Sequence, residues 1–338
     1  MSDLDPAAPL DEIEGPLDAA QFEALRQAMR PRVIRGLVSD WPLVAAARSG
    51  DREVVNYLLE QPPTRKVGAI AAPASQGGRF FYNPEMTGFN FHFGRGALDV
   101  FLADLLRASE VEDPPALAVQ SEDIGELLPH VAAANRLTLL PHVRPRIWIG
   151  NRIQVAPHYD LKENVACCVA GRRRFTVFPP DQTPNLYPGP LELTPAGTPV
   201  SMVDPASPDL ERYPRYADAW QQAASAVLEP GDAIYLPYGW WHGVDSLEAV
   251  SILVNYWWND AERPLQGAPH DALLHAILAL RHLPPEQRRI WRDRLDYYVF
   301  EDGSGAGAHL PPQAQGVLGQ PDEALFARIR EMLRRAIG

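Results

Sequence analysis

Cysteine is nearly absent from the 338-residue chain, which has only Cys167 and Cys168. Adjacent residues of a strand point to opposite faces, so we expect these two thiols to form no structural disulfide. They also have no second pair of sulfur ligands with which to bind zinc. Lysine is equally scarce, with Lys66 and Lys162 as the two examples. The other 29 of the 31 basic residues are arginine, and we attribute this bias to genomic composition.

Long apolar runs are lacking as well. No stretch reaches the roughly 18 apolar residues that would span a bilayer. Residues 1–5 are acidic and lack the basic and apolar regions of a signal peptide. We therefore expect no membrane partner and a cytoplasmic location. The net charge of −12 argues against a nucleic-acid partner.

What remains is the composition of a globular protein with a core, because 46% of the residues are hydrophobic and 22% are charged. The pattern along the chain predicts four regions. Residues 1–15 are expected to form a mobile acidic lead-in, and 16–116 a region of mixed helix and strand. Residues 117–260 are expected to form a β-rich core, and 261–338 a helical region.

Short strand-like runs dominate the centre of the chain, at 146–150, 165–169, 174–178, 233–236 and 250–256. Prolines and glycines separate them. Many short strands with turn residues and little helix between them indicate an antiparallel sandwich or barrel.

One arrangement of histidine and aspartate points to chemistry. His158 and Asp160 are two residues apart after a strand-like region, so their side chains share a face. His242 follows another predicted strand. Two imidazoles and one carboxylate form the facial triad of non-haem iron(II) sites. The alternative is that His158 is a hydrogen-bonded core histidine and His242 is unrelated.

The residues around these positions resemble a known family. The matching segments are 158–160 (HYD), 171–182 (GRRRFTVFPPDQ), 230–232 (PGD), 240–242 (WWH) and 254–257 (VNYW). Together they are similar to the cupin-like JmjC oxygenases, of which the asparaginyl hydroxylase of hypoxia-inducible factor is a member. The match is strong over about 146–258 and weaker over about 17–120.

This resemblance implies a double-stranded β-helix, or jelly roll, that holds iron(II) through His158, Asp160 and His242. It also implies 2-oxoglutarate as co-substrate, with its far carboxylate anchored by Arg173, where the family has a lysine. Arginine can hold a carboxylate through two hydrogen bonds.

Other positions of the implied co-substrate pocket are partly retained. Asn164 and Asn255 are present and would supply amide donors. Val155 replaces the threonine of the family and Ala118 replaces its tyrosine, so two hydroxyls that would support the carboxylate are missing.

Two classes of function remain open. The first is an iron(II)- and 2-oxoglutarate-dependent oxygenase that hydroxylates a side chain of a protein, peptide or small molecule. The second is a cupin-type protein that binds a metal or small ligand without 2-oxoglutarate-dependent turnover. The intact triad favours the first, and the changes at Val155, Ala118 and Arg173 keep the second open.

Two apolar helical stripes follow the predicted core, formed by Leu273, Leu274, Ile277 and Leu278 and by Leu325, Ile329, Leu333 and Ile337. A small helical appendage has little core of its own, so two copies can bury these stripes together. We expect a homodimer built by the C-terminal helices, as the resemblance also implies. The alternative is that both helices pack on the face of the core.

Overall fold

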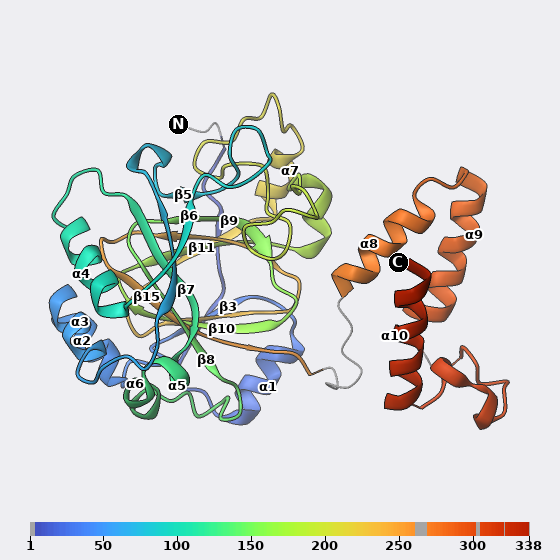
Figure 1. Ribbon diagram of the computed structural model, residues 1–338, viewed down its shortest axis with the longest axis horizontal. Coiled ribbons are helices and arrows are strands. Elements are labelled where there is room, and N and C mark those ends of the chain that lie inside the picture. The colour runs from blue at the N-terminus through green and yellow to red at the C-terminus, as the bar shows by residue number, and fades with distance from the viewer. Residues whose placement is uncertain (1–3, 261–268, 302–304, 321, 338) are drawn as a thin grey trace. The chain divides into compact units, whose positions relative to one another are not determined.

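The computed structural model describes residues 4–260, 269–301, 305–320 and 322–337, and the chain divides into two compact units, 1–259 and 260–338. The second unit thus begins one residue before the expected start of the helical region. Within the described residues, strands occur in the first unit, whereas the second contains helices and turns (Figure 1).

The first unit is built on two β-sheets. The six-stranded sheet has the order β1 (Ala8–Pro9), β12 (Ala224–Leu228), β11 (Arg173–Phe178), β14 (Trp241–Ser246), β9 (Gln154–Tyr159) and β5 (Arg79–Phe80). The nine-stranded sheet has the order β2 (Glu12–Glu14), β3 (Arg32–Arg35), β13 (Ala233–Leu236), β10 (Glu163–Ala170), β15 (Ser251–Trp258), β8 (Pro145–Gly150), β7 (Ala116–Asp123), β4 (Val67–Ala72) and β6 (His92–Gly96).

The strands β8 to β15 form the expected jelly-roll core. Four of them, β12, β11, β14 and β9, are neighbours in one sheet, and the other four, β13, β10, β15 and β8, are neighbours in the other. All pairings within each set are antiparallel. Because most connections cross from one sheet to the other, the two inner faces enclose a common interior.

The strands of the N-terminal region extend this core. Strand β7, which begins at the expected boundary near residue 116, pairs with β8 on one side and with β4 on the other. Strand β4 pairs in turn with β6 at the sheet edge. Residues on either side of that boundary therefore belong to one continuous sheet.

Helices cover the outer face of the nine-stranded sheet (Figure 1). They are α1 (Ala19–Gln27), α2 (Pro42–Ser49), α3 (Asp51–Leu58), α4 (Leu98–Ala108), α5 (Ile124–Leu127) and α6 (Pro129–Ala134), and α7 (Tyr216–Gln221) packs elsewhere. Leu43 and Leu102 are fully buried in the same cluster as Val165 and Cys167 of β10. Cys168 belongs to the interior cluster between the sheets, so the alternation expected for the two thiols is confirmed, and both are free.

The N-terminal segment differs from the mobile lead-in that we expected. Strand β1 pairs in parallel with β12, and β2 pairs in parallel with β3. Glu12 and Asp11 form ion pairs with Arg35 and Arg32 of β3. The acidic side chains that suggested a solvated segment thus form ion pairs that join residues 11–12 to the neighbouring strand β3. Residues 1–3 of the expected lead-in lie outside the described residues.

The second unit contains α8 (Pro269–Leu280), α9 (Pro285–Leu295), a π-helical turn (Asp296–Phe300) and α10 (Glu323–Ile337). Neither α8 nor α9 has a buried side chain. Large apolar side chains are exposed instead, including Leu278, 71% exposed, and Phe300, 73% exposed. None of the helices described has both the length and the apolar character that a membrane crossing requires.

Candidate metal centre and its cavity

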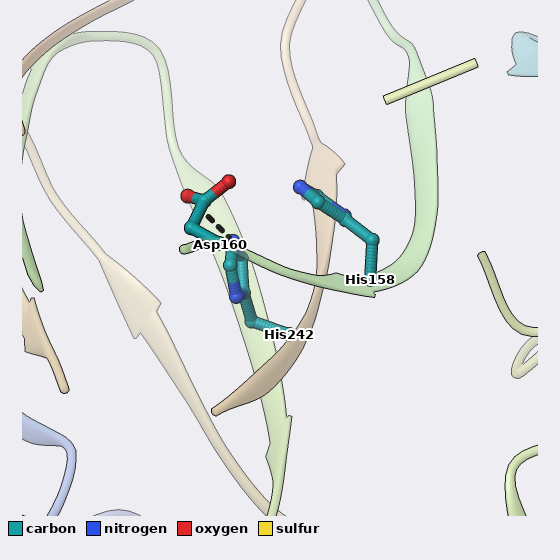
Figure 2. Close-up of side chains that lie close together, drawn as sticks. All are labelled: His158, Asp160 and His242. Carbon is teal, nitrogen blue, oxygen red and sulfur yellow. Dashed lines mark ion pairs between the residues drawn. The ribbon is translucent and has the colours of Figure 1, made fainter. Parts of the chain in front are cut away.

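His158, Asp160 and His242 meet at the inner face of the six-stranded sheet. His158 lies in β9 and His242 in the adjacent β14, where the two are direct cross-strand partners. Asp160 follows β9 immediately, and its carbonyl oxygen accepts a 3.0 Å hydrogen bond from the amide of Gly239. Figure 2 shows the three side chains gathered at one point.

The distances between these groups suit a shared cation. One potential ligand atom from each residue lies within 4.8 Å of the other two. His242 Nε2 is 3.7 Å from Asp160 Oδ2, which is buried and has no hydrogen-bond partner (Figure 2). A buried carboxylate oxygen without a partner is costly, and a divalent cation would supply that partner. The residues present therefore fit a metal ion held by two imidazoles and one carboxylate.

The two imidazoles are oriented by backbone carbonyls. His158 Nδ1 lies 3.0 Å from the carbonyl oxygen of Ala156, and His242 Nδ1 lies 3.0 Å from that of Trp240. A proton on each Nδ1 satisfies these contacts and leaves each Nε2 with a lone pair for a metal. Burial, reinforced by nearby His158, lowers the pKa of His242 to about 4, so this ring is neutral at pH 7.

A cavity of about 430 Å³ adjoins the triad and lies within the range of small-molecule sites. Every residue that the sequence predicts for the site lines it, namely His158, Asp160, His242, Arg173, Asn164, Asn255 and Val155. These residues come from both sheets, because Asn164 and Asn255 lie on β10 and β15 of the nine-stranded sheet and the others belong to or follow strands of the six-stranded sheet. Ala118 also lines the cavity, so Val155 and Ala118, the two positions at which the family has a hydroxyl, both adjoin it.

Arg173 is a buried cation with no carboxylate partner recorded among the described residues. Its exposed fraction is 5%, and its Nε donates a 2.8 Å hydrogen bond to the hydroxyl of Ser251. Burial lowers the pKa of Arg173 to about 10, so the guanidinium stays charged at neutral pH. A buried cation beside a cavity creates a site for an anion.

The two asparagines lie side by side on the opposite sheet. Asn255 Nδ2 donates to Asn164 Oδ1 over 3.4 Å, and Asn255 Oδ1 accepts a 2.9 Å hydrogen bond from Trp148 Nε1. Sequence reasoning missed Trp148 and Ser251. Ser251 could have been noticed as a second polar residue, beside Asn255, in a largely apolar strand, but its hydrogen bond to Arg173 could not.

A jelly roll that carries two histidines and one carboxylate on its inner face defines a cupin-type metal protein. The family model described as "Cupin-like domain" matches residues 18–263, and the chain belongs to this family. JmjC members of the family use iron(II) and 2-oxoglutarate, and His158, Asp160 and His242 of this chain offer a triad that fits such a metal.

Three relatives illustrate the similarity. The Lysine-specific demethylase JMJ31 of Arabidopsis thaliana is 39% identical over 112 residues, which are 33% of this chain and 20% of the relative. HSPB1-associated protein 1 of Homo sapiens is 31% identical over 148 residues, 43% of this chain and 30% of the relative. The Bifunctional peptidase and (3S)-lysyl hydroxylase JMJD7 of Homo sapiens is 28% identical over 264 residues, 68% of this chain and 77% of the relative. The chain thus spans less than a third of the length of the first two.

Proposed function

We propose that this protein is an iron(II)- and 2-oxoglutarate-dependent oxygenase that hydroxylates a side chain of a protein, peptide or small molecule. The observation that carries the proposal is the convergence of His158, Asp160 and His242 on a cavity that also contains the buried guanidinium of Arg173, which has no carboxylate partner among the described residues. A metal site and an anion site in one cavity are what a chelating dicarboxylate requires.

Each residue of the triad has a defined task. His158 and His242 offer Nε2 lone pairs, and Asp160 offers a negatively charged oxygen. When bound, iron(II) would supply the activation of oxygen, coupled to the oxidative decarboxylation of 2-oxoglutarate. Three protein ligands leave further positions on the metal open for co-substrate and oxygen.

Arg173 holds the far carboxylate of 2-oxoglutarate in this proposal. Ser251 fixes the Nε edge of the guanidinium, so the terminal nitrogens are the ones available to a ligand. Asn164 and Asn255 line the same cavity and contribute amide groups. Val155 and Ala118 give no hydroxyl support, so more of the binding depends on the charged pair at Arg173.

The second candidate is a cupin-type protein that binds a metal or small ligand without turnover of 2-oxoglutarate. The absence of hydroxyls at Val155 and Ala118 is the observation that favours it. Two relatives are named for lysine as the residue that they themselves modify.

Anaerobic titration with iron(II) and then 2-oxoglutarate distinguishes the two candidates. Chelation of iron by the co-substrate gives a visible charge-transfer band, which we expect to saturate at one equivalent of each. Succinate also has two carboxylates but lacks the 2-oxo group that this chelation requires, so it serves as the control. Binding of iron without this band would reject the oxygenase and support the binding protein.

We also propose that the protein is a homodimer joined through its second unit. Exposed apolar side chains are concentrated there, among them Leu278, Trp291, Val299 and Phe300. Because α8 and α9 bury none of their own side chains, these two helices form no core that would keep such groups from water. A second copy presents the same surface and can cover it.

A further inference from the structure

Charge is distributed unevenly around the central cavity. Among the described residues that line it, acidic and basic side chains are confined to the three metal ligands and Arg173. Under the proposed function, on which this inference rests, the ligands are occupied by a cation and Arg173 by a carboxylate. No described carboxylate then remains in the lining to receive a cationic group.

A further cation lies close by. Lys162 Nζ is 5.7 Å from the ring centroid of Trp257, which lines the cavity. Like charges repel, so Lys162 adds to the cost of bringing an ammonium or guanidinium group to this site. Removing such a group from water without a partner is unfavourable in any case.

An aromatic row leads from the cavity wall to the surface. Phe80 and Phe91 both line the cavity, with ring centroids 5.3 Å apart. Phe91 stacks on Phe89 with ring centroids 5.0 Å apart. Phe91 and Phe93 form an edge-to-face pair with ring centroids 5.1 Å apart. Phe93 lies on the edge strand β6 and is 69% exposed. An exposed ring that continues a cavity wall offers contact area to an apolar ligand.

We propose that the group received by this site is uncharged and apolar, an aliphatic or aromatic side chain, and that lysyl and arginyl side chains are excluded. The aromatic row Phe89, Phe91 and Phe93 makes the first contacts with the group. The apolar residues that line the cavity then surround the group beside the metal site. The preference follows from burial of apolar surface together with the lack of an uncommitted carboxylate.

Two matched probes test this preference, Nα-acetyl-norleucine amide and Nα-acetyl-lysine amide. Their side chains share a four-carbon chain, and lysine adds a terminal ammonium. Each is titrated anaerobically into the full chain loaded with iron(II) and 2-oxoglutarate. Tryptophan fluorescence reports binding, because Trp148 and Trp257 line the cavity. We expect the norleucine probe to bind roughly tenfold or more tightly than the lysine probe.

Four variants test which residues determine the preference for the norleucine probe. Ala196 lines the cavity and is exposed, so Ala196→Glu adds a carboxylate at little structural cost and should strengthen binding of the lysine probe. Ala196→Gln is the uncharged control and should not. Phe93→Ala should weaken binding of the norleucine probe, whereas Val100→Ala, an exposed apolar residue on α4, should leave it unchanged.

Equal or tighter binding of the lysine probe overturns the proposal, and so does failure of the norleucine probe to bind the loaded protein. If 2-oxoglutarate itself does not bind, the proposed function fails. The comparison is then repeated with metal alone. In that state the free guanidinium of Arg173 repels the ammonium, so the same preference is expected and its absence rejects the inference.

Discussion

Arg173 and Ser251 are joined across the interior of the jelly roll. Arg173 belongs to β11 of the six-stranded sheet and Ser251 to β15 of the nine-stranded sheet, and Arg173 Nε donates to Ser251 Oγ over 2.8 Å. Ser251 is fully buried. A guanidinium fixed at one edge and charged at neutral pH has its remaining donors set for a planar anion. This relationship underlies the first two predictions.

Replacing Arg173 with alanine should weaken binding of 2-oxoglutarate. A hydrogen-bonded pair with charged partners contributes about 1.5–3 kcal/mol, which corresponds to roughly a tenfold to hundredfold loss of affinity. Anaerobic calorimetry on the iron-loaded protein measures the change. Arg173→Lys retains the charge and should lose less than the alanine variant. Unchanged affinity in Arg173→Ala would show that the carboxylate is held elsewhere.

Replacing Ser251 with alanine tests whether the hydroxyl positions the guanidinium. We expect weaker binding of 2-oxoglutarate, by less than in Arg173→Ala because the charge remains. Ser246→Ala is a matched control, since Ser246 is the cross-strand partner of Arg173 in β14 and its buried hydroxyl has no recorded hydrogen-bond partner. Equal affinities in the two serine variants would leave Ser251 with a packing role only.

The metal triad could be predicted from the sequence because it depends on local rules. His158 and Asp160 are two residues apart, and strand alternation is enough to place them on one side. The structure adds that Asp160 lies just past the end of β9 and that His242 lies within β14, directly opposite His158. That pairing joins positions far apart in the chain, and it was reached through the family resemblance.

The bond between Arg173 and Ser251 could not be predicted in the same way. It depends on how far the two sheets are apart, and strand periodicity carries no information about that distance. The N-terminal strands β1 and β2 are a similar case. They are two and three residues long, too short for alternation to identify a strand, so their pairing depends on partners elsewhere, such as the ion pair between Glu12 and Arg35.

Replacing Asp160 with alanine should sharply weaken binding of divalent metal. The change removes a protein ligand, so the loss should exceed the roughly 10- to 100-fold that loss of an outer hydrogen-bond partner causes. Competition with a coloured chelator measures the affinity. Asp181→Ala is the control, because Asp181 is exposed and does not line the cavity. Iron affinity equal to that of the wild type would reject the assignment of the site.

The two cysteines should be inert in the folded protein. Burial raises the pKa of both thiols, that of Cys168 to about 12, so each remains protonated through pH 9. The thiolate is the reactive form, and both side chains are 0% exposed. A thiol reagent such as DTNB at pH 8 should therefore label neither residue until denaturant unfolds the chain. Rapid labelling of the native protein would contradict this burial.

The homodimer predicts how single changes in the second unit affect the molecular mass in solution. Leu278 is 71% exposed on α8, and Leu278→Glu places a charge on the surface that we expect a second copy to cover. Light scattering at micromolar concentration should show a dimer for the full chain and a larger monomer fraction for this variant. Val111→Glu is the control, because Val111 is an exposed apolar residue of the first unit.

Truncation after Asn259 tests the same interface by removing the second unit, with no residue of the first unit substituted. The first unit has its own core of sheets and covering helices, so we expect it to remain soluble and to become monomeric. A full-length monomer would reject the dimer. A truncated protein that is still dimeric would place the interface in the first unit, where the exposed edge strand β6 and its Phe93 would be the next surface to change.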